Sequence, residues 1–186
     1  MAARPLGTPS TDATVLAAIE TSPSLTFPTF TAATALDLGL ALRSRILALP
    51  SSSRKPAVIS IALTGCEGIP QIVFQCVTES GTVPDNEVWV RRKRNTVLRF
   101  GVSSWLMRQK MVSATNGLLS ATSLEDSFTA KFAVDRRDYA IHGGGVPIRV
   151  RGVDGVLGAI VVSGLKQEDD HQVVVETIEE WIRHAN

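Results

Sequence analysis

The run VLGAIVVSG, residues 156–164, places the strongest constraint on how this chain can fold. It is apolar almost throughout, so a strand formed here must be covered on both faces. The preceding run, VPIRVRGV at residues 146–153, alternates apolar side chains with arginines, and Asp154-Gly155 between the two runs is a pair favoured in tight turns. Together they predict a β-hairpin whose second strand lies in the centre of a sheet between helices.

The rest of the pattern supplies helices and a second pair of strands. Residues 57–63 and 71–77 are rich in β-formers and flank turn residues, which predicts an antiparallel pair. Four segments have the caps, periodicity and stop signals of helices: residues 30–50, 84–101, 103–117 and 167–184. In the first of them Leu36, Leu40 and Leu47 fall close to one apolar stripe. Residues 118–141 look less regular.

This order predicts an α/β fold, an α+β sandwich with a mainly antiparallel sheet of about five strands between helices. Residues 1–26 are rich in Thr, Ser, Pro and Ala. We expect them to form a loosely attached, weakly ordered arm with one short helix near residues 12–20. A single domain over residues 27–186 follows.

The composition excludes several classes of protein. Among 186 residues, 19 basic and 18 acidic side chains leave a formal net charge of +1, which argues against a nucleic-acid or membrane partner. No run approaches the roughly 20 apolar residues of a membrane helix. Cys66 and Cys76 are too few for a tetrahedral zinc site or a disulfide framework. We therefore expect a cytosolic protein with reduced thiols. With three histidines in the chain we expect no metal cage of protein ligands, although His142 and His171 with a carboxylate could form one if the segments that carry them meet in space.

The stretch IHGGGVPIRV, residues 141–150, places His142 before three consecutive glycines. His-Gly-Gly-Gly also occurs in the oxyanion hole of some α/β-hydrolases, but their G-x-S-x-G nucleophile elbow is missing from this chain. Two readings remain open. Gly143, Gly144 and Gly145 either shape a tight bend that only glycine tolerates or offer backbone N–H groups to an anion.

The run RRKR, residues 91–94, with Arg99 concentrates cations on one helix. It is interpreted either as a solvated or subunit-facing surface or as a clamp for carboxylates. Lys93 shares helical spacing with Trp89 and Phe100, an unusual side for a lysine.

The stretch SGLKQEDDHQ, residues 163–172, lies where the central strand turns into the last helix. Ligands often gather at such strand ends. His171, in the first turn of the helix, is expected either to pack in the core or to meet a ligand as a neutral imidazole.

Three long blocks now resemble a known family: PDNEVWVRRKRNTVLRFGVSS, DYAIHGGGVPIRV and GVLGAIVVSGLKQEDDH. They are similar, in order and spacing, to the haem-degrading-domain family, also called GlcG/HbpS-like, over about residues 27–183. The resemblance implies a profilin- or PAS-like α/β domain, homo-oligomers, and in some members the binding, degradation or sensing of haem.

The resemblance also implies a pocket. The family's Lys, Thr and Phe-Gly match Lys93, Thr96, Phe100 and Gly101, and its Gly-Gly-Val-Pro-Ile begins here at Gly144. Its Val-Ser-Gly matches residues 162–164. In many haem-binding members a proline precedes the glycines, where this chain has His142 and Gly143.

We therefore expect a cytosolic homo-oligomer that binds haem or another small anionic ligand between the basic helix 87–100, the His-Gly-Gly-Gly loop and the start of the last helix. His142 or His171 would face the iron or the reactive centre. The candidate ligand-binding residues are Arg92, Lys93, Thr96, Arg99, Gly143, Gly144, Gly145, Ser163 and Gly164. The alternatives are a non-enzymatic oligomeric adaptor and a metabolic isomerase or cyclase with His142 as general acid or base.

Overall fold

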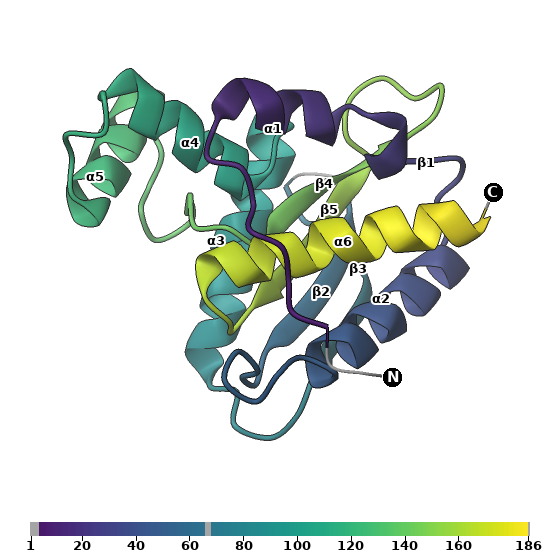
Figure 1. The fold of residues 1–186 in the computed structure, drawn as a ribbon. Coiled ribbons are helices and arrows are strands. Elements are labelled where there is room, and N and C mark those ends of the chain that lie inside the picture. The colour runs from purple at the N-terminus through teal and green to yellow at the C-terminus, as the bar shows by residue number, and fades with distance from the viewer. Residues whose placement is uncertain (1–3, 66–67, 186) are drawn as a thin grey trace.

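A computed structural model describes residues 4–65 and 68–185 of the chain (Figure 1). In chain order the elements are α1 (Ala13–Glu20), a short 3-10 turn η1 (Pro23–Leu25), β1 (Thr26–Phe27), α2 (Ala32–Leu47), β2 (Val58–Leu63), β3 (Gln71–Val77), α3 (Pro84–Phe100), α4 (Ser104–Ala114), α5 (Ala121–Phe132), β4 (Gly145–Val150), β5 (Gly158–Ser163) and α6 (Gln167–Ala185). Among these described residues, no helix is both long and apolar enough to cross a membrane.

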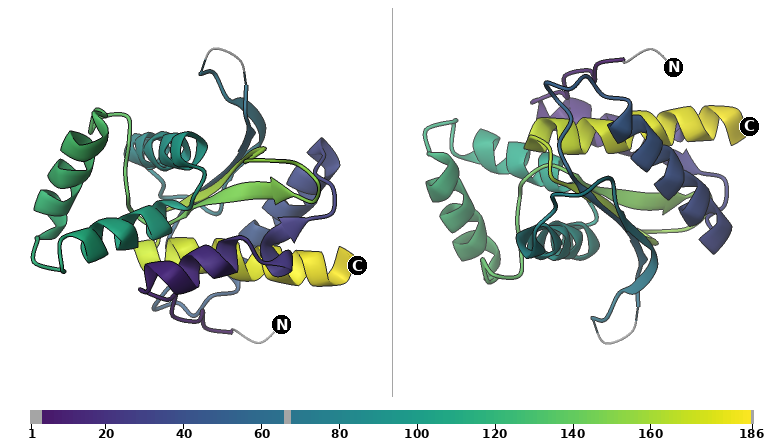
Figure 2. Two further views of the ribbon diagram at one scale, coloured as in Figure 1. Left: turned by 90° about the horizontal axis from the view of Figure 1, so that it is seen from above. Right: turned by 90° about the horizontal axis from the view of Figure 1, so that it is seen from below.

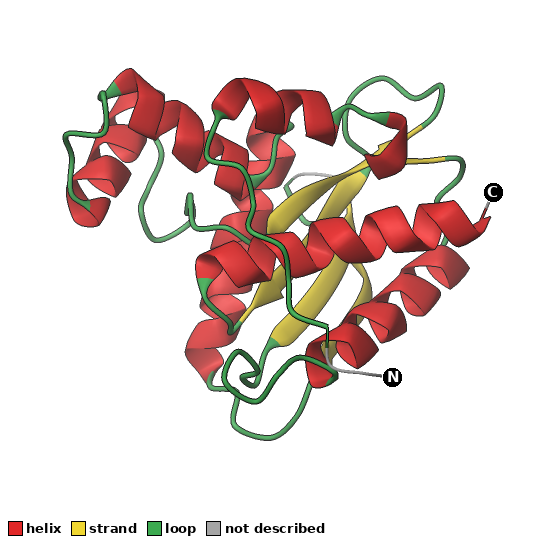
Figure 3. Ribbon diagram, viewed as in Figure 1, coloured by secondary structure: helices red, strands yellow, loops and turns green. Residues whose placement is uncertain are grey.

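The strands form one five-stranded sheet in the order β1-β4-β5-β2-β3 (Figure 3). Strand β1 runs parallel to β4, while the β4–β5, β5–β2 and β2–β3 pairs are antiparallel. The predicted α/β fold with a mainly antiparallel sheet of about five strands is therefore confirmed. Strand β5 lies at the centre of the sheet, as its continuous apolar run predicted.

Helices cover both faces of β5 (Figure 2). Ile160 and Val162 belong to the large core that α2 and α6 close on one face. Ala159 and Val161 pack with Val90 of α3 on the opposite face. Because neighbouring residues of a strand point to opposite faces, burial on both sides accounts for the unbroken apolar run at residues 159–162.

The residues of helix α2 that face the core are not those of the expected apolar stripe. Its core side is formed by Ala35, Leu38, Leu42 and Ile46, whereas Leu36 and Leu40 are each 50% exposed. The sequence of this helix is apolar on more than one side, so its periodicity alone did not identify the buried face. Its start was predictable, since Thr31 and Thr34 cap it reciprocally.

Two further segments differ from the expectations. Residues 121–132, within the stretch that looked irregular, form α5, which extends away from the sheet beside α4 (Figure 1). The described residues of the N-terminal arm make specific contacts: Trp105 donates from Nε1 to the Ser10 carbonyl over 2.8 Å, and Leu25 lies in the main core. The domain boundary at residue 26 stays a prediction.

Cys76 is a half-buried free thiol, and Cys66 lies outside the described residues.

Candidate functional site

The basic run of α3 is mostly buried. Arg92, Lys93 and Arg94 expose 9%, 2% and 6% of their surface, so the expectation of a solvated helix face is wrong for these three residues. Charges of this kind are tolerated in a protein interior only when polar groups satisfy them. Their partners therefore decide what the helix can offer to a ligand.

The ammonium of Lys93 is paired inside the protein. Its Nζ lies 2.9 Å from Oδ2 of Asp170 in the first turn of α6 and donates to the Val162 carbonyl over 3.0 Å. Asp170 also accepts the backbone N–H groups of Gly164 and Leu165. The pair links α3, the end of β5 and the start of α6, and it leaves the lysine charge neutralised.

The glycine loop packs tightly against this ion pair. Gly144 has φ +117°, and a Cβ there would lie 2.4 Å from the Val162 carbonyl oxygen and 2.8 Å from Nζ of Lys93. A Cβ at Gly143 would lie 2.3 Å from the Gln167 carbonyl oxygen. The glycines thus allow the chain to pass between α3 and the start of α6, as the tight-bend reading expected.

His142, at the start of this loop, contacts a buried carboxylate. Its Nδ1 lies 2.8 Å from Oε1 of Glu125 on α5, and the His142 side chain remains 30% exposed. The Trp89 ring meets the imidazole edge to face, with ring centroids 4.7 Å apart. Nδ1 and Oε1 of Glu125 are both buried, and their contact is electrostatic, without the geometry of a hydrogen bond. The exposed part of the ring is its opposite edge, which carries Nε2. A carboxylate at one nitrogen commonly orients a histidine for chemistry at the other.

Glu125 is held in its ionised form by cations. Burial raises the pKa of its carboxyl, but the contact with His142 and the charges of Arg92 and Arg136 outweigh burial and lower the pKa below its ordinary value. Arg136 lies 3.2 Å from the carboxylate and Arg92 4.0 Å from it. The Arg92 guanidinium also stacks over Trp89, 4.2 Å from the ring centroid.

The exposed edge of His142 lines a cavity of about 260 Å³ between α3, the loop after β5 and the start of α6. Several predicted residues meet here, because Lys93, Ser163 and Gly164 line the same cavity. Asn86, Trp89, Leu165, Gln167 and Asp170 complete its wall. The wall is therefore mixed, with one indole ring, one imidazole, two side-chain amides and one hydroxyl beside the Lys93–Asp170 pair.

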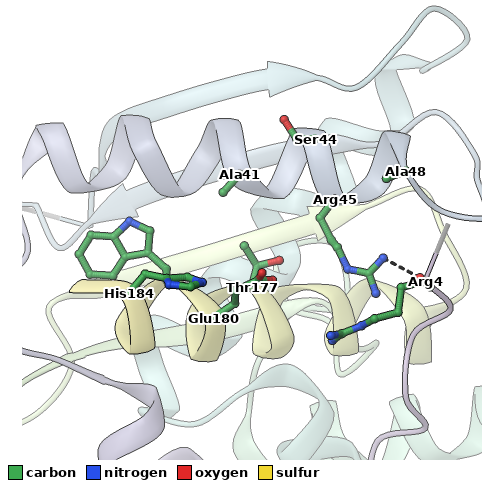
Figure 4. A pocket seen from close by; sticks show the side chains of 9 residues that line it. Arg4, Ala41, Ser44, Arg45, Ala48, Thr177, Glu180 and His184 are labelled. Atoms are coloured by element: carbon green, nitrogen blue, oxygen red, sulfur yellow. Dashed lines mark hydrogen bonds between the residues drawn. The ribbon is translucent and has the colours of Figure 1, made fainter. Parts of the chain in front are cut away.

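The structure does not bring the three histidines together, since each lines a different cavity. His171 is buried on the opposite side of α6 and lines a cavity of about 150 Å³ against the N-terminal arm. Burial, with a smaller contribution from the Lys93 ammonium, lowers the pKa of His171 to about 3. His184 lines a groove of about 490 Å³ between α2 and α6, in which Figure 4 shows Arg4 and Arg45 near the opposite end.

Other predicted residues lie behind the His142 cavity or away from it. Thr96 is fully buried and exchanges hydrogen bonds with the backbone of Ala140. Arg99 is exposed and donates to the Phe132 carbonyl. Gly145 donates its N–H to Ser104. These residues support the loop and α3.

Glu125 is the site residue that sequence reasoning missed. Helix α5 carries a recognisable start, since Ser120 caps it through the N–H of Ser123, and Leu124 and Phe128 share its buried side at helical spacing. Those signals identify a helix in residues 118–141. The contact of its glutamate with His142, 17 positions later in the sequence, depends on tertiary packing.

The fold and this cavity define an α/β domain in which a carboxylate-held histidine faces a surface cavity beside a buried Lys–Asp pair. A family model described as haem degrading protein HbpS-like matches residues 30–179. The chain belongs to this HbpS-like haem-degrading domain family, and the resemblance seen in the sequence is confirmed.

Its relatives include UPF0303 proteins of yeast and bacteria. The chain is 35% identical over 150 residues to the UPF0303 protein YBR137W of Saccharomyces cerevisiae, covering 81% of this chain and 74% of that protein. It is 37% identical over 142 residues to the UPF0303 protein SCO2848 of Streptomyces coelicolor, covering 76% of this chain and 79% of that one.

Two crystal structures share the fold. That of Ybr137w superposes with a TM-score of 0.76 at 31% identity and covers 94% of this chain and 89% of that one. The structure of HbpS superposes with a TM-score of 0.54 at 15% identity, covering 82% of this chain and 89% of that one. At that identity the second comparison shows the fold alone.

Proposed function

We propose that the chain binds haem or another small anionic ligand at the His142 cavity, as a cytosolic homo-oligomer. The observation that carries this proposal is the pairing of His142 with Glu125. A histidine whose Nδ1 contacts a buried carboxylate presents Nε2 to the cavity, and a neutral imidazole nitrogen is a ligand for haem iron. Membership of the HbpS-like family supports the same ligand class.

The size of the cavity limits how such a ligand would sit. At about 260 Å³ it lies just below the roughly 300–1,000 Å³ of typical small-molecule sites. It therefore suits one edge of a large flat ligand or the whole of a small one. Trp89 would stack against a flat ligand, and His142 would meet its centre. Haem, when bound, would supply iron redox chemistry, and the residues of this chain would orient it.

Anionic groups of the ligand need a cation other than Lys93. That ammonium is already neutralised by Asp170. Arg92 lies at the edge of the site through its stacking on Trp89, so we assign it to the carboxylates of the ligand. This arrangement favours a ligand that reaches outward from the cavity along α3.

A haemin titration followed by the Soret band tests the proposal. We expect saturable binding of one haemin per subunit, weakened at least about tenfold in His142→Ala, because an axial ligand is lost. His184→Ala, an exposed histidine in another groove, serves as the matched control and should bind like the wild type. Binding that does not saturate, or equal weakening of binding in both variants, would contradict the proposal that haem binds at His142.

A second candidate function is acid–base catalysis on a small polar substrate, as an isomerase or cyclase. The contact between Glu125 and His142 favours it, because a carboxylate at Nδ1 supports proton transfer at Nε2. Isotope exchange from D₂O into a panel of small oxo and hydroxy acids tests it. Exchange that is lost in His142→Ala would support catalysis, and the absence of exchange with every compound would count against it.

The third reading, an adaptor with no ligand, receives less support. A pocket filled by side chains would have favoured it, and the His142 cavity is open. Size-exclusion chromatography with light scattering tests the homo-oligomer that the proposal includes.

A further inference from the structure

A groove lined by arginines lies on the outer side of α3, apart from the His142 cavity. It has a volume of about 440 Å³, and its lining residues are Val88, Arg91 and Arg92 of α3 with Arg136 and Arg137 of the segment after α5. Two regions distant in the sequence thus place four guanidinium groups around one hollow. Neither His142 nor Lys93 lines it.

Carboxylates accompany these arginines without lining the groove. Arg91 pairs with Asp138 over 2.7 Å, and Arg137 pairs with Asp135 over 3.3 Å. Glu125 and Asp126 each lie 3.2 Å from Arg136. None of the four acidic residues is among those lining the hollow, but their charges balance those of the four arginines. A ligand that enters the groove therefore meets guanidinium groups directly and competes with these carboxylates for them.

Three of the guanidinium groups are accessible from solvent. The side chains of Arg91, Arg136 and Arg137 are 46%, 50% and 88% exposed, while that of Arg92 is 11% exposed and anchored by Trp89. The groove therefore combines one fixed guanidinium with three that can adjust to a ligand. Each planar guanidinium can donate two parallel N–H bonds to one oxyanion.

We propose that this groove binds a compact phosphate compound with two or more negative charges, of the pyrophosphate or phosphate-ester class. Four guanidinium groups match the many oxygens of such a ligand. A ligand whose charges are separated by a carbon skeleton is disfavoured, because Val88 is the one apolar side chain that the groove offers among its lining residues. The groove does not include His142, but it shares Arg92 with the site proposed for the His142 ligand.

The groove is also connected to the His142 site through shared arginines. Arg92 and Arg136 line the groove and face the carboxylate of Glu125, which contacts His142. A phosphate compound in the groove competes with Glu125 for these two cations. Binding there therefore weakens the hold of Glu125 on both arginines and changes the electrostatic surroundings of His142.

Isothermal titration calorimetry with inorganic pyrophosphate tests the site. We expect one saturable event per subunit, weakened about tenfold in Arg91→Gln and in Arg137→Gln, because each change removes a charge-assisted hydrogen bond. Arg99→Gln is the matched control, since Arg99 is an exposed arginine of the same helix outside the groove. It should bind pyrophosphate like the wild type.

Citrate, titrated in parallel, separates the phosphate class from any small polyanion. We expect citrate to bind at least about tenfold more weakly than pyrophosphate. Citrate binding of equal strength would overturn the assignment to phosphate compounds. The absence of pyrophosphate binding at millimolar concentration, or equal weakening in Arg99→Gln, would overturn the site itself. Neither result depends on whether haem binds at His142.

Discussion

The ammonium of Lys93 lies 2.9 Å from a carboxylate oxygen of Asp170, and each side chain is at least 96% buried. This pair joins α3 to α6 under the glycine loop and so fixes the wall of the His142 cavity. A lysine that the resemblance places in a ligand pocket is therefore a structural residue first.

Breaking this pair should destabilise the fold strongly. Lys93→Met leaves the Asp170 carboxylate buried without its cation, and removal of one partner of such a pair typically costs about 3–5 kcal/mol. Urea unfolding measures the free energy of unfolding. The double variant Lys93→Met with Asp170→Leu should recover a large part of the loss, since no unpaired charge remains. If Lys93→Met alone stayed within 1 kcal/mol of the wild type, the pair would have no structural role.

Gly144→Ala should destabilise the protein by more than about 2 kcal/mol, because it adds a close backbone contact to an unfavourable φ. The new Cβ would lie 2.4 Å from the Val162 carbonyl oxygen at φ +117°. Gly155→Ala is the matched control. It also has positive φ, +83°, but its Cβ would meet nothing within 4 Å, so we expect about 1 kcal/mol from strain alone. Equal losses in the two variants would contradict the packing role of Gly144.

The sheet could be predicted because its signals are local. Residues 159–162 of β5 are all apolar since both faces are covered, and Gly155 before the strand takes the positive φ that its turn requires. The buried face of α2 could not be predicted, because the helix carries leucines on its exposed side as well, at Leu36 and Leu40. Which side packs is decided by partners elsewhere in the chain.

The candidate site was predictable where its signals are local and not where they depend on tertiary packing. The glycine loop beside His142 is a local signal, and it does border the cavity through His142. The burial of Lys93 depends on Asp170, 77 positions further along the chain. The role of Glu125 depends on how α5 packs, which no spacing between charged residues reveals.

His171 should make stability depend on pH. Its folded pKa of about 3 lies below the ordinary value of about 6.5, so between these values the unfolded chain binds the extra proton. The contribution of His171 to the free energy of unfolding is therefore fully present above pH 6.5 and is lost as the pH falls toward 3. The loss is on the order of 3 kcal/mol between pH 6.5 and pH 4.

Urea unfolding at several pH values measures this slope, with His171→Gln as the variant. We expect the variant to lose less stability on acidification than the wild type, whatever its stability at neutral pH. His184→Gln changes an exposed histidine and should leave the slope unaltered. A slope that persisted in His171→Gln would assign the acid sensitivity to other groups.

Glu125 should fix the tautomer of His142. With Nδ1 2.8 Å from the ionised carboxylate, the imidazole proton belongs on Nδ1, which leaves the lone pair of Nε2 free toward the cavity. Two-bond ¹H–¹⁵N correlation spectra of ¹⁵N-histidine-labelled protein, recorded above neutral pH, distinguish the two tautomers. Glu125→Ala removes the negative charge beside Nδ1, so His142 should populate the Nε2–H form. Glu125→Gln retains an acceptor oxygen and should preserve much of the Nδ1–H form.

Asp126→Asn, which alters the exposed neighbour that pairs with Arg136, should leave the spectrum of His142 unchanged. If Glu125→Ala also left the spectrum of His142 unchanged, the Glu125 carboxylate would not be what orients His142. The case for Nε2 as the reactive nitrogen would then lose its physical basis.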